Sequence, residues 1–235
     1  MSHAVVRLAL LLSLGVLVAP VAWAQPINIS PPLLTTDLSG VWDYDIVYVR
    51  SPRTLPCTTA CPAPALWAEF SRPTATNAGT DLMLLHPDGS EELLVAGDVG
   101  AIQDPMVALD GQSIYYTRFH LAGAVPNKSG SDIEQIDLTT REIRRLTTQA
   151  WTTNRGDIPS SAGVYNMHPC PVPGGDILYV SNRNAYYPPL GSYPDFAWQL
   201  HRMDENGENI ETIGPMNLGS ALHPTLLQDG RVMFS

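Results

Sequence analysis

The sequence has few charged residues, few cysteines and few long apolar runs. Charged residues make up 15% of the 235 residues, and 23 acidic against 13 basic side chains give a net charge of −10. A strongly acidic chain without a basic cluster is a poor ligand for phosphate backbones or anionic lipid, so nucleic-acid binding is not expected. Long helical patterns are scarce, whereas 18 Gly and 21 Pro are present. This composition is typical of a β-rich, loop-rich globular protein.

The long apolar run that does occur lies within residues 1–24, which are organised like a secretory signal peptide. Arg7 precedes the run, and the small residues Ala22 and Ala24 predict cleavage before Gln25. An uncleaved membrane anchor is the alternative, but the apolar run is short for a span. We therefore expect a periplasmic or secreted protein with no membrane span in the mature chain.

Three cysteines are present, and export would permit them to form disulfides. Cys57 and Cys61, in "LPCTTACP", are spaced for a short disulfide loop if the turn geometry allows it. Haem c attachment requires His directly after the second cysteine, where Pro62 stands, and partners for a zinc site are not evident. Cys170 is expected to be a buried thiol. The prediction is therefore no metal and no cofactor within this chain.

Repetition is what the sequence has in plenty. A polar residue, a Pro, a short extended run, a DG or GG turn and an alternating apolar strand recur in "DPMVALDGQSIYYTR" (104–118), "HPCPVPGGDILYVSN" (168–182) and "HPTLLQDGRVMFS" (223–235). A half-copy, "DIVYVRSPR", begins at Asp45. A second hairpin unit alternates with these copies, in "DLMLLHPDGSEELLV" (81–95), "DIEQIDLTTREIRRLT" (132–147) and "WQLHRMDENGENIETIG" (198–214). Because Gly supplies the positive φ of hairpin turns, each period predicts four antiparallel strands.

Four-stranded units in tandem predict a β-propeller, with an ordinary antiparallel sandwich as the alternative. The same position in the second strand of each period is occupied in turn by Ile46, Ile114, Ile177 and Val232. This register predicts about two complete blades and a half-blade at each end over residues 41–235, after an N-terminal linker at 25–40. Propellers close with typically four to eight blades. We therefore expect an all-β, partial β-propeller that is a fragment of a longer chain, with closure by several copies as the alternative.

These repeats resemble those of TolB-like periplasmic β-propellers. The resemblance is carried by "DPMVALDGQSIYYTRF", "EQIDLTTREIRRLT" and "LHRMDENGENIETIG". More narrowly, "HPCPVPGGDILYVSNRNA", "LHRMDENGEN" and "LHPTLLQDGRVMFS" are similar to the middle propeller domain of hydrazine synthase alpha-subunit-like proteins. In hydrazine synthase itself, c-type haems on CxxCH motifs carry the chemistry, and this sequence has no such motif. The resemblance therefore implies a fold, and it places haem only in a region beyond residue 235.

Long connections are expected at one end of the blades, because alternate turns of a meander fall on opposite ends. They are predicted at 51–80, 119–131, 148–167 and 182–197, and insertions on one face of a repeat protein often mark the binding face. Aromatic residues gather in them: Trp67, Phe70, Trp151, Tyr165, Tyr186, Tyr187, Tyr193 and Phe196. They predict a contact surface for a protein or saccharide partner, or small cores of the loops themselves.

The same end should receive the start of each innermost strand, at Asp104, His168 and His223, each just before the repeat Pro. In a closed propeller these residues would ring the mouth of the central channel. Asp and His there are suited to a metal or a polar ligand. The alternative is that each side chain satisfies local backbone groups.

Motifs for chemistry are absent from the sequence: it has no nucleophile elbow, P-loop, dinucleotide fingerprint or zinc-protease helix. The sequence thus leaves open whether the protein is an enzyme. The leading hypothesis is an exported propeller scaffold that binds a protein or saccharide partner through its long-loop face. Two alternatives remain: the propeller of a haem-dependent redox protein, and a propeller that gates a hydrolase domain, each with its catalytic part beyond residue 235.

Overall fold

All regular structure in the computed structural model is β-sheet. The structure describes residues 42–52, 73–121, 129–152, 163–187, 196–213 and 220–235. The strands are β1 (Ile46–Arg50), β2 (Asp81–Leu85), β3 (Glu91–Val95), β4 (Ala101–Val107), β5 (Ser113–Phe119), β6 (Ser131–Asp137), β7 (Ile143–Arg145), β8 (Asn166–Pro171), β9 (Ile177–Ser181), β10 (Gln199–Met203), β11 (Glu211–Thr212), β12 (Thr225–Leu226) and β13 (Val232–Met233). The predicted signal peptide and linker lie outside the described residues. Among those described, no helix has the length and apolarity to cross a membrane.

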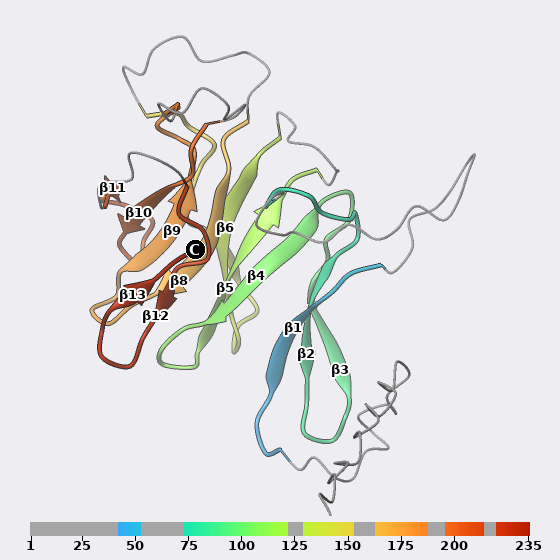
Figure 1. Ribbon diagram of the computed structural model, residues 1–235. Coiled ribbons are helices and arrows are strands. Elements are labelled where there is room, and N and C mark those ends of the chain that lie inside the picture. The colour runs from blue at the N-terminus through green and yellow to red at the C-terminus, as the bar shows by residue number, and fades with distance from the viewer. Residues whose placement is uncertain (1–41, 53–72, 122–128, 153–162, 188–195, 214–219) are drawn as a thin grey trace, which may run out of the picture.

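The strands form four antiparallel meanders in chain order. Strands β4 to β7 and β8 to β11 make complete four-stranded sheets, β1 to β3 make a three-stranded sheet, and β12 pairs with β13. In Figure 1 the β4–β7 sheet lies between the β1–β3 sheet and the β8–β11 sheet. The expected all-β class and the tandem four-stranded units are confirmed. The first sheet has one strand more than the predicted half-blade, and the described strands form an open succession of sheets, not a closed ring.

The Gly residues of two DG turns make equivalent turns in the β4–β7 and β12–β13 sheets. Gly111 N donates to Ala108 O at 2.9 Å before β5, and Gly230 N donates to Leu227 O at 3.0 Å before β13. Both glycines lie in the left-handed region, at φ 72° and 85°, where a Cβ would be strained. The DG signal in the sequence therefore has the same conformational cause in each copy.

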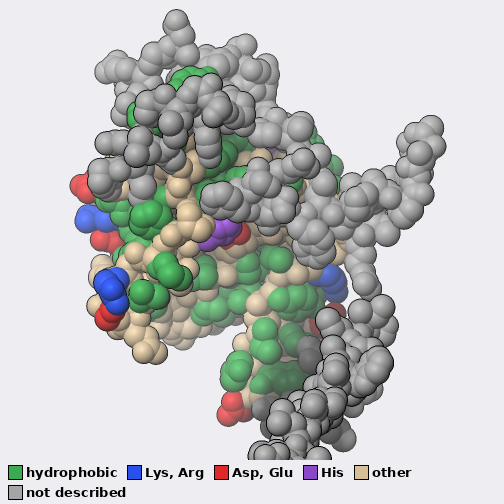
Figure 2. Space-filling view, viewed as in Figure 1, with side chains coloured by type: hydrophobic (Ala, Val, Ile, Leu, Met, Phe, Trp, Pro, Cys, Tyr) green, Lys and Arg blue, Asp and Glu red, His purple; other side chains and the backbone are tan. Residues whose placement is uncertain are grey.

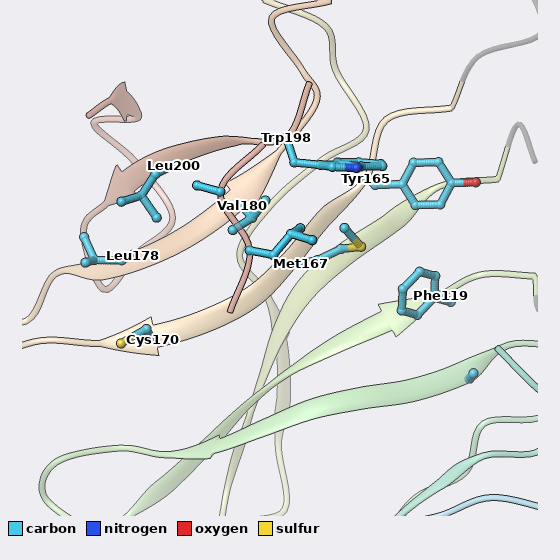
Figure 3. Close-up of a cluster of buried hydrophobic side chains, with 11 residues drawn as sticks. Phe119, Tyr165, Met167, Cys170, Leu178, Val180, Trp198 and Leu200 are labelled. Carbon is cyan, nitrogen blue, oxygen red and sulfur yellow. The ribbon is translucent and has the colours of Figure 1, made fainter. Parts of the chain in front are cut away.

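Apolar side chains fill the interfaces between successive sheets. Alternation along β5 sends Ile114 and Tyr116 toward the β1–β3 sheet and Tyr115 toward the β8–β11 sheet, so this blade is buried on both faces. The largest cluster belongs to the β8–β11 sheet, where Tyr165 packs edge-on against Trp198 at 5.7 Å (Figure 3). Tyr165 was expected among the loop aromatics, but it is 2% exposed and belongs to this core.

Backbone hydrogen bonds also cross from each sheet to the next. Each time, a residue at or just before the start of β2, β6 or β10 bonds to the beginning of the following sheet. The bonds are Ile102 N to Thr80 O (2.8 Å), Ser131 N to Val164 O (3.1 Å) and Ala221 N to Trp198 O (2.9 Å). The blades are therefore joined by the same ladder chemistry that builds each of them.

Asp132 is a fully buried carboxylate whose partners come from two blades. It accepts hydrogen bonds from His120 Nε2 (2.8 Å), Thr147 Oγ1 (3.0 Å), Gln149 Nε2 (3.2 Å) and, from strand β8, Asn166 Nδ2 (3.3 Å). A buried charge is tolerated when it is paired and its oxygens are satisfied. This network ties the β4–β7 sheet to the β8–β11 sheet near the long connections.

Candidate functional site

Asp104, His168 and His223 occupy equivalent positions of the three repeat copies, the first two at bulges within the inner strands. Each precedes its Pro and has a left-handed backbone, at φ 53°, 54° and 52°. The expectation that these residues start their strands is wrong for two of them, because β4 begins at Ala101 and β8 at Asn166. The pairing register slips at Asp104 and His168, and such bulges are where a sheet accepts Pro.

The residue types at these positions fit this backbone. Non-glycine residues rarely adopt positive φ, and Asp, Asn and His are enriched among those that do. The conformation costs about 1–2 kcal/mol in a residue that carries a Cβ. Asp and His in the repeat are therefore explained in part by conformation, independently of any ligand.

The side chains at these positions meet across the blade boundaries. Thr117 Oγ1 donates to Asp104 Oδ2 at 2.9 Å and accepts from His168 N at 3.1 Å. His168 Nε2 lies 3.6 Å from Asp104 Oδ2, and His223 N donates to His168 Nδ1 at 3.4 Å. The two histidine rings lie 4.0 Å apart at 35°. The structure thus brings together all three residues that the repeat singled out.

A cleft of about 180 Å³ opens beside these residues. Its walls are Asp104, Pro105, Met106, His168, Pro169, His223, Pro224 and Thr225. Figure 2 shows histidine next to an acidic side chain near the middle of this face, bordered by hydrophobic side chains. The described residues contain no group of three or more His, Cys, Asp and Glu placed to hold a metal ion.

His168 is neutral in this setting. Burial lowers its pKa, the Asp104 carboxylate raises it, and His223 lowers it further. A neutral ring accepts the His223 N–H on Nδ1 and turns its Nε2–H toward Asp104, which uses both nitrogens. These contacts link the inner strands of successive sheets to one another. Ligand binding in the cleft stays a prediction.

The long-connection end presents a small aromatic group. Trp151 meets Phe196 edge-on at 5.4 Å, and Tyr187 meets Phe196 at 4.5 Å. Phe196 is buried, whereas Tyr187 is 51% exposed. Tyr186 lies beside Tyr187 and is partly buried. Trp67, Phe70 and Tyr193 lie outside the described residues, as do Cys57 and Cys61, while Cys170 is a buried free thiol.

A second cavity, of about 380 Å³, adjoins this aromatic group and was not predicted from the sequence. It lies against the face of the β8–β11 sheet that looks toward β4–β7. Its lining residues are Ala150, Trp151, Thr152, Arg183, Asn184, His201, Ile210 and Thr212. This cavity combines one aromatic, one cation and several hydrogen-bonding side chains, the mixture typical of a site for a polar organic ligand.

His201 forms the floor of this cavity. Its ring stacks on Tyr179 at 5.4 Å, its Nδ1–H donates to Gln199 O at 2.9 Å, and its Nε2 lies 3.5 Å from Asn184 Nδ2. Burial lowers the pKa of His201 to about 4, and the Arg183 charge adds to that effect. The ring is therefore neutral at neutral pH.

One sequence signal could have identified His201. Tyr48, Tyr116 and Tyr179 are equivalent in the three sheets, and their cross-strand partners are Met83, Glu134 and His201. In the β4–β7 sheet, Tyr116 donates to the Glu134 carboxylate at 2.9 Å. Aligning the repeats therefore shows a position where the residue type changes from blade to blade, as expected where local function replaces a shared structural role.

Comparison with known proteins gives fold neighbours. No protein-family model and no curated protein matches the chain. Similar solved structures include TolB from Acinetobacter baumannii (18% identity, 66% of this chain, 32% of that chain, TM-score 0.45) and a TolB candidate from Agrobacterium tumefaciens (21%, 66%, 50%, 0.41). Kuenenia stuttgartiensis hydrazine synthase is similar over 81% of this chain and 27% of that chain, at 16% identity and a TM-score of 0.48. The chain thus spans half or less of each of these proteins. TolB-like proteins, hydrazine synthase among them, are its neighbours in fold, and no closer assignment follows.

Proposed function

We propose that this chain is part of an exported propeller scaffold that binds a saccharide at the end of the blades that carries the long connections. The observation that supports it is the cavity beside Trp151, with its hydrogen-bonding rim. Pyranose rings combine apolar C–H faces with a hydroxyl edge, and an aromatic ring beside amide and hydroxyl groups complements both. A protein partner at the same end is the second candidate, supported by the exposed ring of Tyr187.

The cavity is held open by its own hydrogen bonds. Asn184 Nδ2 donates to Gln199 Oε1 at 2.8 Å and to Thr212 Oγ1 at 2.9 Å, and Asn184 Oδ1 accepts from Thr152 Oγ1 at 2.8 Å. Thr152 N also donates to Arg183 O at 2.9 Å. Groups fixed before binding lose little entropy when a ligand arrives, which favours affinity.

An array of neutral and acidic oligosaccharides, probed with the purified chain, tests the proposal. We expect binding to a subset of glycans and a loss of about two- to tenfold for Trp151→Ala, because an aromatic contact of this kind contributes about 0.5–1.5 kcal/mol. Tyr44→Ala is the matched control, since Tyr44 is an exposed aromatic, at 64%, next to β1 and away from the cavity. A blank array, or equal losses for both variants, would contradict saccharide binding at this site.

The redox alternative makes a separate prediction. A haem-bearing CxxCH segment should follow residue 235 in the gene, and sequencing beyond that point checks it. An open reading frame without such a segment would refute this alternative and leave the scaffold proposal standing.

A further inference from the structure

The cavity beside Trp151 carries the opposite charge to the protein as a whole. The chain has a net charge of −10, yet none of the eight lining residues is an Asp or a Glu, and one is Arg183. The remaining polar linings, Thr152, Asn184, Thr212 and His201, are uncharged at neutral pH. The positive charge of the cavity lining therefore comes from a single guanidinium, that of Arg183.

Arg183 differs from most other arginines of the described residues in lacking a carboxylate. Six of those arginines lie within ion-pair distance of an Asp or Glu: Arg50, Arg118, Arg141, Arg145, Arg202 and Arg231. Arg183 has no such pair in the described part of the chain. Its one side-chain bond there runs from Nη1 to Tyr179 Oη at 3.0 Å. A guanidinium has five N–H donors, so Arg183 keeps most of its capacity for a ligand.

The surroundings keep this charge in place without neutralising it. Tyr179 is fully buried, and burial raises the pKa of its hydroxyl, so it accepts the Arg183 hydrogen bond as a neutral phenol. His201 stacks on the same phenol ring and is also neutral. Arg183 is therefore anchored by one N–H next to two neutral rings, where its attraction for an anion is screened less than in open water.

We propose that the cavity binds an acidic saccharide, with a sugar carboxylate on the Arg183 guanidinium and the sugar ring beside Trp151. This inference rests on the proposed saccharide-binding function and names the class of sugar. Guanidinium and carboxylate form paired, charge-assisted hydrogen bonds, which are stronger than bonds between neutral groups. Asn184 and Thr212, already oriented by their mutual bond, are placed to meet sugar hydroxyls.

Two trisaccharides that differ only at C6 test the inference by titration calorimetry: cellotriose and its uronate form, β-1,4-linked triglucuronate. We expect the acidic sugar to bind about tenfold or more tightly than the neutral one, because a hydrogen bond between charged groups exceeds one between neutral groups by about that factor. The advantage should shrink as salt is raised, because ions screen a partly exposed pair. Arg183→Gln should remove the advantage, and Arg183→Lys should restore part of it.

Arg202→Gln is the matched control. Arg202 neighbours His201 on β10, pairs with Asp176 at 3.3 Å, and its substitution removes the same charge without touching the cavity. It should leave both affinities within about twofold of the wild type. Equal binding of the two sugars by the wild type would overturn the inference and leave saccharide binding intact. Acidic binding that survives Arg183→Gln would also overturn it, and binding of no sugar at all would overturn the proposed function with it.

Discussion

Replacing His201 by Gln should remove a specific part of the protein's sensitivity to acid. His201 is 1% exposed, and its pKa is lowered from 6.5 to about 4 in the folded protein. Unfolding exposes the ring and returns its pKa to the ordinary value. Between pH 6.5 and about pH 4 the unfolded chain therefore binds more protons than the folded one. The contribution of His201 to the free energy of unfolding is therefore fully present above about pH 6.5 and is lost as the pH falls toward 4.

The size of the loss follows from the two pKa values. At about 1.4 kcal/mol per pKa unit, the difference corresponds to about 3 kcal/mol by pH 4, with about 2 kcal/mol already lost at pH 5. A loss of that size is a large fraction of the free energy of unfolding of a single domain, which is about 5–15 kcal/mol. His168, whose pKa burial also lowers, adds to the loss in the same direction.

Urea unfolding of wild type and His201→Gln at pH 7 and pH 4 measures this loss directly. The variant should be less stable at pH 7, because Gln cannot stack on Tyr179, but its loss on going to pH 4 should be smaller by about 3 kcal/mol. His86→Gln is the control: His86 is partly exposed and its pKa is raised by the hydrogen bond to Asp45, so its removal does not reduce the acid loss. NMR titration of the His201 ring in the wild type should give a midpoint near pH 4. Equal acid losses in His201→Gln and wild type, or a midpoint near 6.5, would refute the reasoning.

Two further predictions concern stability and are checked by the same unfolding assay. Gly130→Ala should cost more than about 3 kcal/mol, because a Cβ there would overlap a backbone oxygen of the next blade at a positive φ of 61°. Gly111→Ala, at φ 72° in open space, should cost only about 1–2 kcal/mol, and equal costs would contradict the packing argument. Asp132→Ala should cost about 3–5 kcal/mol, because it leaves buried donors without their acceptor. Exposed Glu142→Ala should cost under about 0.5 kcal/mol, and a similar value for Asp132 would show that its network is dispensable.

The sheet architecture could be predicted because the repeat encodes it locally. Ile114 and Ile177 lie at the beginnings of equivalent second strands, and the DG and GG turns connect paired strands, as the backbone conformation of Gly allows. The same repeat pointed to Asp104, His168 and His223 as neighbours. It did not reveal that the Pro of the first two copies lies at a bulge, because β4 and β8 begin a few residues earlier in sequence that looks like loop.

The cavity beside Trp151 could not be predicted, since it is assembled from four separate segments. Trp151 follows one blade, and Arg183 lies just after the second strand of the next. The third and fourth strands of that blade supply His201 and Thr212. Trp151 and Arg183 lie outside the repeat copies, so the repeat gives no reason to place them together. Arg183 stands out because no described carboxylate pairs with it. The sequence alone does not show which arginines form ion pairs with distant segments. The assignment of Tyr165 to the loop face failed for a related reason: a residue just before a strand can still turn into the core.

The bonds between blades bear on how the chain acquires its structure during synthesis. A ribosome releases the β4–β7 sheet before residue 166, so Asp132 first emerges without the Asn166 amide and Thr117 without the His168 N–H. Domains generally begin to fold from the N-terminal side as they emerge. Each nascent blade must therefore wait, with unsatisfied polar groups at its leading edge, until the following blade arrives to complete it. Maturation should proceed blade by blade in the order of translation, and a pause in elongation between blades would hold the chain in its least protected state.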